Sequence, residues 1–251
     1  MKRALLWAAI GLVPMATPLF AQAPPLEHFQ CYAVLKADPL TLDIPVRLRD
    51  QFEEDDAQVV RARRFCNPAG KFHRNQFFPV QDDRQHLTFY ATFPQSSPLR
   101  IVQLSNQFNR PGTTQQTWRV REAVALAVPT HKPPHDRPEG LDHYRCYAAN
   151  GNPVFEGVGL VDQFLSFTGR FVLDPVMFCN PVQKTRLDTG EVTPIMNRDA
   201  HLACYSMTRA PFQGERDVAN QFGRQTFALG PPDTICVPTR KIAFTEIPDI
   251  P

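Results

Sequence analysis

Six cysteines and four regularly spaced histidines are the residues of this chain whose types and spacing could do chemistry. The cysteines could form disulfides or hold zinc, and the histidines could bind a metal or transfer protons. The histidines recur every 57 or 58 residues, each opening a short motif that ends in tyrosine, at His28, His86, His143 and His201. Because an active site is needed once, a histidine present at one place in every copy is explained more simply by the folding of each copy.

Two further signatures follow each histidine motif in the same order, which indicates four copies of one module. The first is Gln-Phe preceded by an acid or amide, at Asp50, Asn106, Asp162 and Asn220. The second contains proline and ends at a lysine, at Lys71, Lys132, Lys184 and Lys241. The odd copies read Asp-Gln-Phe and Cys-Asn-Pro, whereas the even copies read Asn-Gln-Phe and Val-Pro-Thr. This alternation indicates that the unit of duplication was a pair of copies.

The cysteines follow the repeat. Copies one, three and four each hold two cysteines at the same two places, and copy two has Phe89 and Ala127 there instead. Two residues that are present together and absent together are expected to be bonded. We predict disulfides between the first strand of a copy and the end of its third, in the pairs Cys31 with Cys66, Cys146 with Cys179 and Cys204 with Cys236. Zinc sites are disfavoured, because no CxxC-type spacing is present.

A buried polar network is predicted around each repeated histidine. We expect His28, His86, His143 and His201 to pair with the Asp or Asn of the Gln-Phe signature, or with the closing lysine, and so to hold the strands together. Metal binding is the lesser alternative. The tyrosines of the histidine motifs and the phenylalanines of the Gln-Phe signatures are expected in the core, and Trp118 is expected there rather than at an exposed contact.

The elements that must position these residues are short strands. The segments 28–35, 45–52 and 58–65 are rich in valine, leucine and aromatic residues and partly alternate apolar with polar side chains. Twenty-five prolines also argue against a helical fold. A three-stranded sheet of this size cannot cover its own apolar face. The fold class is therefore predicted as all-β, with four three-stranded repeats packed as two two-repeat sandwich-like or barrel-like domains; a four-bladed propeller is the alternative.

The predicted domain boundaries follow from the repeats. Copies one and two occupy residues 24–133, copies three and four occupy 142–251, and the proline-rich run 134–141 reads as a stiff linker. Residues 1–23 combine basic, apolar and small-residue regions in the order of a secretory signal peptide. We therefore predict a secreted or periplasmic protein, in which disulfides persist. No later stretch is long and apolar enough to span a membrane.

The charge and the motifs limit the function. Beyond the signal, 25 basic residues balance 25 acidic ones, which is not typical of a nucleic-acid-binding protein. Nucleophile-elbow, zincin, phosphate-loop and calcium-loop motifs are absent from the sequence. The leading hypothesis is a non-catalytic protein, without metal or cofactor, that binds a protein or glycan partner or serves a structural role. The alternative is a secreted hydrolase with a site at the domain junction, near Asp82, Asp83 or His135.

The combined pattern of His-x-x-Cys-Tyr, Asp-Gln-Phe and Cys-Asn-Pro-x-x-Lys resembles an uncharacterised family of tandem repeats in predicted secreted bacterial proteins. The copies in that family read roughly LCYKV, DQF and LCNPxxK. The match covers nearly the whole chain after the signal and is weakest in copy two. The resemblance supports export, repeats and the disulfide pairing, and it implies no catalytic residues.

Overall fold

The computed structural model describes residues 25–94 and 99–247. These residues form sixteen strands and no helix, so the all-β prediction is confirmed. In this described part of the chain, no helix is long and apolar enough to cross a membrane. The predicted signal peptide, residues 1–23, lies outside the described residues.

The strands fall into four segments that match the sequence repeat. Segment one forms β1 (Phe29–Asp38), β2 (Ile44–Arg49), β3 (Glu54–Pro68), β4 (Gly70–His73) and β5 (Gln76–Phe78), and segment two forms β6 (Leu87–Phe93), β7 (Arg100–Ser105) and β8 (Gln116–Pro129). Segment three forms β9 (Tyr144–Asn150), β10 (Glu156–Val161), β11 (Thr168–Pro181), β12 (Gln183–Arg186) and β13 (Val192–Thr193), and segment four forms β14 (His201–Met207), β15 (Gly214–Asn220) and β16 (Gly223–Glu246).

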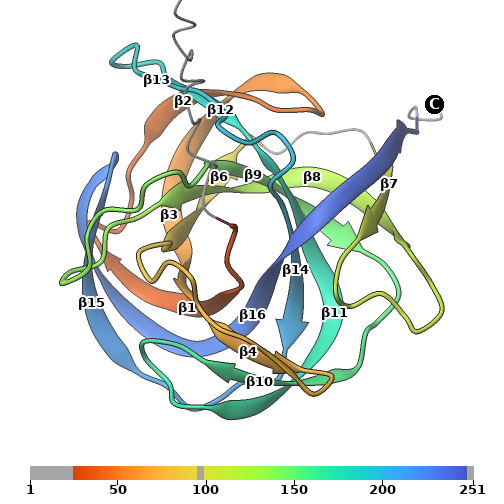
Figure 1. The fold of residues 1–251 in the computed structure, drawn as a ribbon. Helices are drawn as coiled ribbons and strands as arrows, with labels where there is room; N and C mark the ends of the chain where they lie inside the picture. The colour runs from red at the N-terminus through yellow and green to blue at the C-terminus, as the bar shows by residue number, and fades with distance from the viewer. Residues whose placement is uncertain (1–24, 95–98, 248–251) are drawn as a thin grey trace, which may run out of the picture.

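The first and third strands of every segment form one closed ring. The order around the ring is β1, β3, β6, β8, β9, β11, β14, β16 and back to β1, with every pair antiparallel. Figure 1 shows the ring from one end, with the remaining strands outside it. An eight-stranded barrel is just wide enough for side chains to fill its interior.

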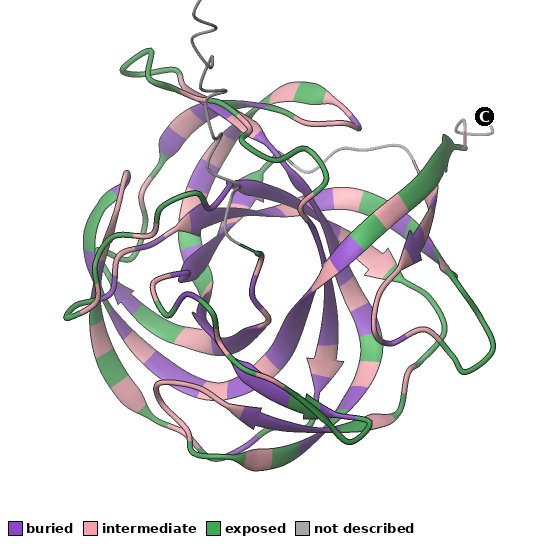
Figure 2. Cartoon of the chain, viewed as in Figure 1, coloured by how far each residue is buried: buried purple, intermediate pink, exposed green. Residues whose placement is uncertain are grey.

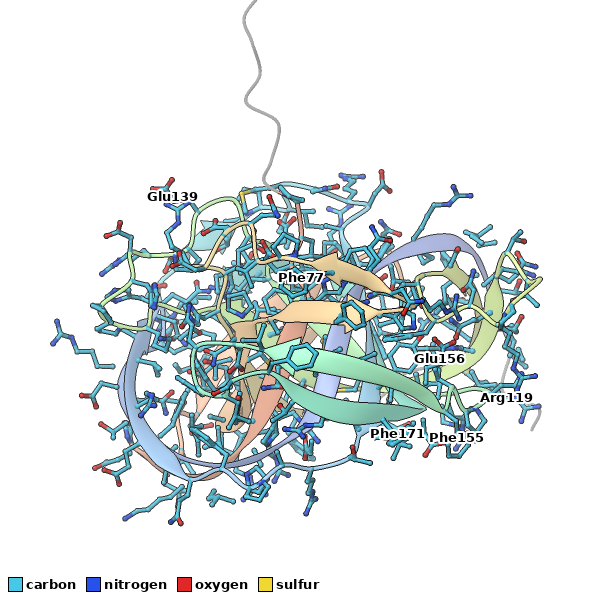
Figure 3. All side chains as sticks on the ribbon, turned by 60° about the horizontal axis from the view of Figure 1, so that its bottom comes forward. Phe77, Arg119, Glu139, Phe155, Glu156 and Phe171 are labelled. Carbon is cyan, nitrogen blue, oxygen red and sulfur yellow. A yellow bond between two sulfur atoms is a disulfide. The ribbon has the colours of Figure 1, made fainter. Side chains whose placement is uncertain are left out.

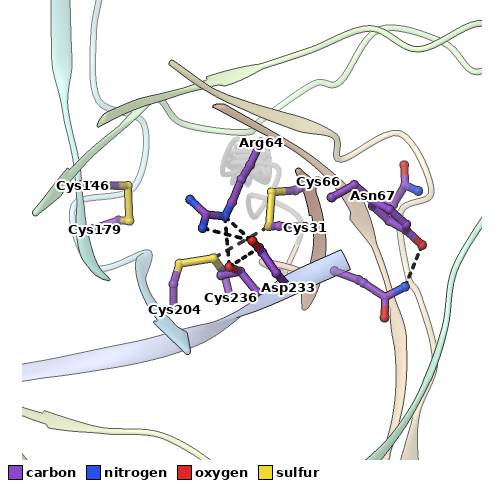
Figure 4. Close-up of a disulfide and its surroundings, with 12 residues drawn as sticks. Cys31, Arg64, Cys66, Asn67, Cys146, Cys179, Cys204, Asp233 and Cys236 are labelled. Atoms are coloured by element: carbon purple, nitrogen blue, oxygen red, sulfur yellow. Dashed lines mark hydrogen bonds and ion pairs between the residues drawn. A yellow bond between two sulfur atoms is a disulfide. The ribbon is translucent and has the colours of Figure 1, made fainter. Parts of the chain in front are cut away.

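Three disulfides lie inside the ring. Cys31–Cys66, Cys146–Cys179 and Cys204–Cys236 each join directly paired residues of neighbouring strands, and the three predicted pairs are therefore present. Figure 4 shows the three disulfides close to one another, with ring strands around them. At the fourth place Phe89 is paired with Ala127, and both belong to the same buried cluster as the cysteines. A large ring opposite a small methyl group fills the space of a disulfide by packing alone.

The second strand of each segment forms an outer layer. β2, β7, β10 and β15 pair with the first halves of β3, β8, β11 and β16, outside the ring. After the ring strand, the chain continues as a tail that crosses to the second strand of the segment two places along. β4 pairs with β10, β12 with β2, and the end of β16 with β7. Segments one and three thus exchange tails.

The strands alternate as half-buried strands should. Along β2, Val46 and Leu48 face the core while Arg47 and Arg49 face solvent, as predicted. Figure 2 shows buried positions lining the ring and exposed positions concentrated on the outer strands and loops. Trp118 is fully buried between the ring and the outer layer, so its predicted place in the core is confirmed.

The structure corrects the predicted division into two domains, 24–133 and 142–251. β8 pairs with β9 across the predicted linker 134–141, and β1 pairs with β16, so a single sheet runs through both halves. The same continuity rules out separate propeller blades. The four segments cover their apolar faces by enclosing one shared interior, and not by packing in two separate pairs.

Candidate functional site

The Gln-Phe signatures are turns at the ends of the second strands. Asp50 Oδ1 accepts hydrogen bonds from the backbone N–H of Phe52 and Glu53, and Asp162 makes the same turn. Asn106 and Asn220 each accept one such bond from the phenylalanine two residues on. An acid or amide that bonds the backbone two residues ahead is the usual reason for Asp or Asn in turns.

The other side of each turn residue reaches a tyrosine of the segment two places along. Tyr32 donates to Asp162 at 2.8 Å, and Tyr147 donates to Asp50 at 2.9 Å. Burial and the nearby carboxylate raise the pKa of both hydroxyls, which keeps them protonated as donors. In the even segments, Asn220 and Asn106 instead donate to Tyr90 and Tyr205.

This exchange explains the alternation in the sequence. Asp162 and Asp50 can only accept hydrogen bonds, and each takes one from the asparagine of a Cys-Asn-Pro motif, Asn67 or Asn180. The turn asparagines donate, and each meets the threonine of a Val-Pro-Thr motif, Thr130 or Thr239. At these turns, odd segments contact odd ones and even segments contact even ones, so donors and acceptors vary together.

The repeated histidines meet the glutamine of the signature. His28 donates to Gln107 at 3.1 Å and His86 donates to Gln163 at 2.9 Å, while Gln221 contacts His143. Lys71 and Lys184 contact the same glutamines, Gln107 and Gln221. In segments one and three the histidine thus shares a polar network with the closing lysine, as one of the two predicted arrangements has it, through a common glutamine. The other predicted arrangement, a direct pair with Asp or Asn, is wrong, because those side chains bond tyrosines instead.

Burial keeps these imidazoles neutral. Desolvation lowers the pKa of His28, His143 and His201 to about 3 and that of His86 to about 4, and nearby lysines add to the effect. His201 differs from the other three in its contacts. Gln51, the glutamine at the corresponding place of the series, donates to the Arg198 carbonyl at 2.7 Å instead. In the part of the chain that the structure describes, no group of three or more His, Cys, Asp or Glu side chains could hold a metal ion.

The residues named for a hydrolase site contact one another or a neighbouring arginine. Asp82 forms an ion pair with Arg84 at 2.8 Å, and Asp83 Oδ2 lies 3.2 Å from His135 Nδ1. Asp83 is 64% exposed. A hollow of about 400 Å³ does lie beside the 134–141 segment, but it is lined by Asp38 and Asp217 rather than by these residues. The acidic run that follows Asp50 is likewise paired, with every carboxylate from residue 53 to 56 facing an arginine.

Several exposed phenylalanines lie on one face of the sheet formed by β5, β4, β10 and β11, which we call the aromatic face. On the sheet β5–β4–β10–β11, Phe77 pairs with Phe72, Phe72 with Gly159, and Gly159 with Gly169. Directly paired residues share one face of a sheet. Gly157 and Phe171 form the next row on the same side. Phe72, Phe77, Phe167 and Phe171 are 40 to 58% exposed, and Figure 3 shows this side of the molecule with Phe77 and Phe171 labelled.

The glycines of β10 make room for these rings. A Cβ placed on Gly159 would lie 2.0 Å from the Phe167 ring, so this ring lies directly over the glycine backbone. Phe72 and Phe167 also meet edge to face, with centroids 6.5 Å apart. Taking roughly 200 Å² for a full phenylalanine side chain, the four rings expose about 400 Å² of apolar surface. Patches of that size on a monomer are often functional.

Ion pairs border the aromatic face at one end. Arg74 donates to Glu156, which also contacts the buried His73, and Arg74 reaches the Asn109 carbonyl at 3.1 Å. Phe155 lies at the same end, immediately before β10, with φ at 51° and its side chain 70% exposed. An apolar centre with a polar rim is the usual anatomy of a protein interface.

The sequence contains a signal for this face that motif reasoning missed. The outward positions of the second strand read Pro45, Arg47 and Arg49 in segment one but Gly157, Gly159 and Val161 in segment three. Glycine is disfavoured inside strands unless something approaches the backbone closely. Two outward glycines opposite phenylalanines could therefore have marked the surface, but only once β4 was known to lie beside β10.

Residues 16–97 and 92–238 match a family model described as a repeat of unknown function, DUF7450. No curated protein and no solved structure matches the chain. The matched ranges extend across most of the sequence and include all six cysteines. The chain therefore belongs to the DUF7450 repeat family.

Proposed function

We propose that this protein is a secreted or periplasmic, non-catalytic binding protein whose partner is another protein, docked on the aromatic face of β5, β4, β10 and β11. The observation that carries the proposal is the group of four exposed phenylalanines on one sheet face. Three disulfides fit an oxidising compartment. Most polar residues of the repeated motifs bond one another inside the common fold of the four segments, which we call the frame. The outer surfaces are therefore the places that can carry function.

A protein partner is favoured over a glycan because of the chemistry around the rings. Phenylalanine is enriched in the buried centres of protein interfaces, whereas a sugar also needs donors and acceptors for its hydroxyls. The charged groups beside the face, Arg74 and Glu156, already pair with each other. The Phe167 ring covers Gly159 and is 58% exposed, and an exposed ring can also stack on a sugar. The experiment must therefore separate a protein partner from a glycan.

The test compares two surfaces of the same protein. Phe72→Ser with Phe171→Ser removes apolar area from the aromatic face, and Arg47→Ser with Arg49→Ser changes the equivalent charged face as the matched control. Each variant is immobilised and exposed to the native secretome, and captured proteins are purified and titrated back by calorimetry. We expect a partner that binds the wild type and the arginine variant but loses at least tenfold affinity for the phenylalanine variant. Equal affinity for all three, or binding of purified glycans alone, would contradict the proposal.

A further inference from the structure

Within residues 25–94 and 99–247, three of the four outer strands carry a tail strand along their outer edge and the fourth, β15, does not. β10, β2 and β7 are each covered along their outer edge by a tail, with three, four and six paired residues respectively. Among the described residues, β15 pairs only with β16 and makes a single bridge to the tail of segment two, between His131 and Ala219. In Figure 1, β15 forms the outer edge on one side of the ring.

Proline explains why this tail stops. His131 and Ala219 exchange both backbone hydrogen bonds, at 2.8 and 2.9 Å. In an antiparallel ladder the next pair of this kind lies two residues along, which would place Pro133 opposite Asp217. Pro133 has no N–H to donate, so the ladder cannot continue. The backbone N–H and C=O of Asp217 and the N–H of Glu215 point to the same side as those of Ala219, toward the outer edge of β15, where no described strand lies; we call this position the vacant lane. The Glu215 carbonyl points there too, but it accepts a hydrogen bond from Arg216 Nη1 at 2.6 Å.

A hollow of about 400 Å³ opens at this place, between the sheet and the segment that begins at Pro133. Asp38, Thr226 and Asp217 form one row on the outer face of the sheet there, and Thr226 donates to Asp217 at 2.7 Å. The row thus presents two carboxylates. Two arginines also line the hollow: Arg224 belongs to the neighbouring row with Ala219 and His131, and Arg137 lies in the segment that follows Pro133.

We propose that an extended segment of a partner polypeptide adds to β15 as a strand in this vacant lane, with a basic side chain opposite Asp217. At the outer edges of β10, β2 and β7 a tail strand already occupies the corresponding position, so the fold accepts a strand there. Free N–H and C=O groups at a sheet edge supply the affinity in strand addition, and alternate side chains supply the specificity. A basic residue opposite Asp217 extends a row that already holds two carboxylates, and opposite charges directly across strands attract.

The test uses an acetylated and amidated Lys-Val-Lys-Val-Lys pentapeptide, titrated into the disulfide-bonded protein by calorimetry. Binding should saturate and should slow hydrogen exchange at the backbone amides of Asp217 and Glu215. Asp217→Lys should weaken binding about tenfold, because attraction is replaced by repulsion. Gln103→Lys is the matched control at the equivalent position of β7, whose lane is filled, and should leave the affinity unchanged.

A second peptide separates strand addition from charge attraction. The same sequence, methylated on the amide nitrogens that would face β15, keeps its charges but cannot donate to the edge. Loss of binding by this peptide supports the proposal. Equal binding by the methylated peptide, no saturable binding of the parent peptide, or exchange protection elsewhere than β15 would each overturn it. Phe72→Ser with Phe171→Ser should not alter the peptide affinity, so this lane is tested separately from the aromatic face.

Discussion

The tail of segment one lies on the second strand of segment three, and the tail of segment three lies on the second strand of segment one. The two faces that result correspond residue by residue. Phe72, Gly159 and Gly169 form a row across β4, β10 and β11, and the equivalent row across β12, β2 and β3 is Thr185, Arg47 and Asp56. One row is aromatic and open, and the other is a ladder with Arg47 and Asp56 paired at 2.7 Å.

The residues just beneath these rows hardly differ. Lys71 is paired with Leu160 under the aromatic face, and Lys184 is paired with Leu48 under the charged face. All four side chains are at most 1% exposed. Packing and buried hydrogen bonds restrict the inner side of each strand, whereas solvent tolerates many side chains on the outer side. The two regions therefore share one buried set of residues and differ in their outer residues, which are the ones that the proposed partner would contact.

The largest expected effect comes from titrating the frame that both regions share. The buried histidines have a pKa near 3 or 4 in the fold against 6.5 unfolded, so stability present above pH 6.5 is lost as pH falls toward 4. Each imidazole costs about 2 kcal/mol at pH 5. Burial also lowers the pKa of Lys71 to about 7 and of Lys184 to about 8, so stability should rise further up to about pH 10. Urea unfolding at pH 5, 7 and 9 measures this, and a stability maximum near pH 5 would contradict it.

The second prediction concerns the two turn aspartates, Asp50 and Asp162, which should contribute equally to stability. Asp50→Ala removes the partner of Tyr147, Asn180 and a turn, and Asp162→Ala removes the partner of Tyr32 and Asn67. Each variant should lose about 3 kcal/mol of unfolding free energy, because buried donors are left unpaired. Chemical denaturation of both, with the milder Asp→Asn changes as controls, checks the prediction. Losses that differ by more than about 2 kcal/mol would break the equivalence.

Exchanging outer residues between the two regions should change stability little but should change the hydrophobicity of the surface. Gly159→Arg places the residue of β2 on β10 and displaces the Phe167 ring, which is already 58% exposed. The unfolding free energy should change by less than about 1 kcal/mol. Retention on a phenyl column should fall for Gly159→Arg and should rise or stay constant for Arg47→Gly. Unchanged retention of Gly159→Arg would show that the rings do not form the apolar surface.

The smallest effect belongs to the charged ladder itself. The side chains of Arg47 and Asp56 are 50% and 52% exposed, so water and salt screen their attraction. Asp56→Ala should leave the denaturation midpoint unchanged within error, at low and at high salt. A clear loss would show that the ladder stabilises the fold and is not only a surface feature.

Several features of the frame could be predicted from local sequence. Three copies hold two cysteines at the same two places, and the fourth copy holds neither. Because the two cysteines occur together in a copy, the pairing of Cys31 with Cys66 could be predicted from the repeat. The alternation along β2 also predicted which of Val46, Arg47 and Leu48 are buried. Such features depend on contacts within about 40 residues of chain, which the repeat makes visible.

The candidate site could not be predicted in the same way. Phe72 and Gly159 are far apart in sequence and belong to different segments, and neither carries a motif of its own. The prediction that histidine would pair with Asp or Asn failed for a related reason. Tyr32 and Asp162 are also distant in sequence, and their contact exists only because the ring brings segments one and three together.

The sequence by itself determined the unit of this protein: an all-β module with three signatures, a stapled pair of cysteines and one position where Phe89 and Ala127 replace the staple. Only the tertiary structure decided that four modules close into one ring, that odd segments exchange tails with odd ones, and that no strand of the described residues lies along the outer edge of β15. Local patterns report which side of a strand is buried. Which strand lies beside a given strand depends on closure of the whole sheet, because the backbone groups at the edge of a segment are paired only when the neighbouring segment is in place.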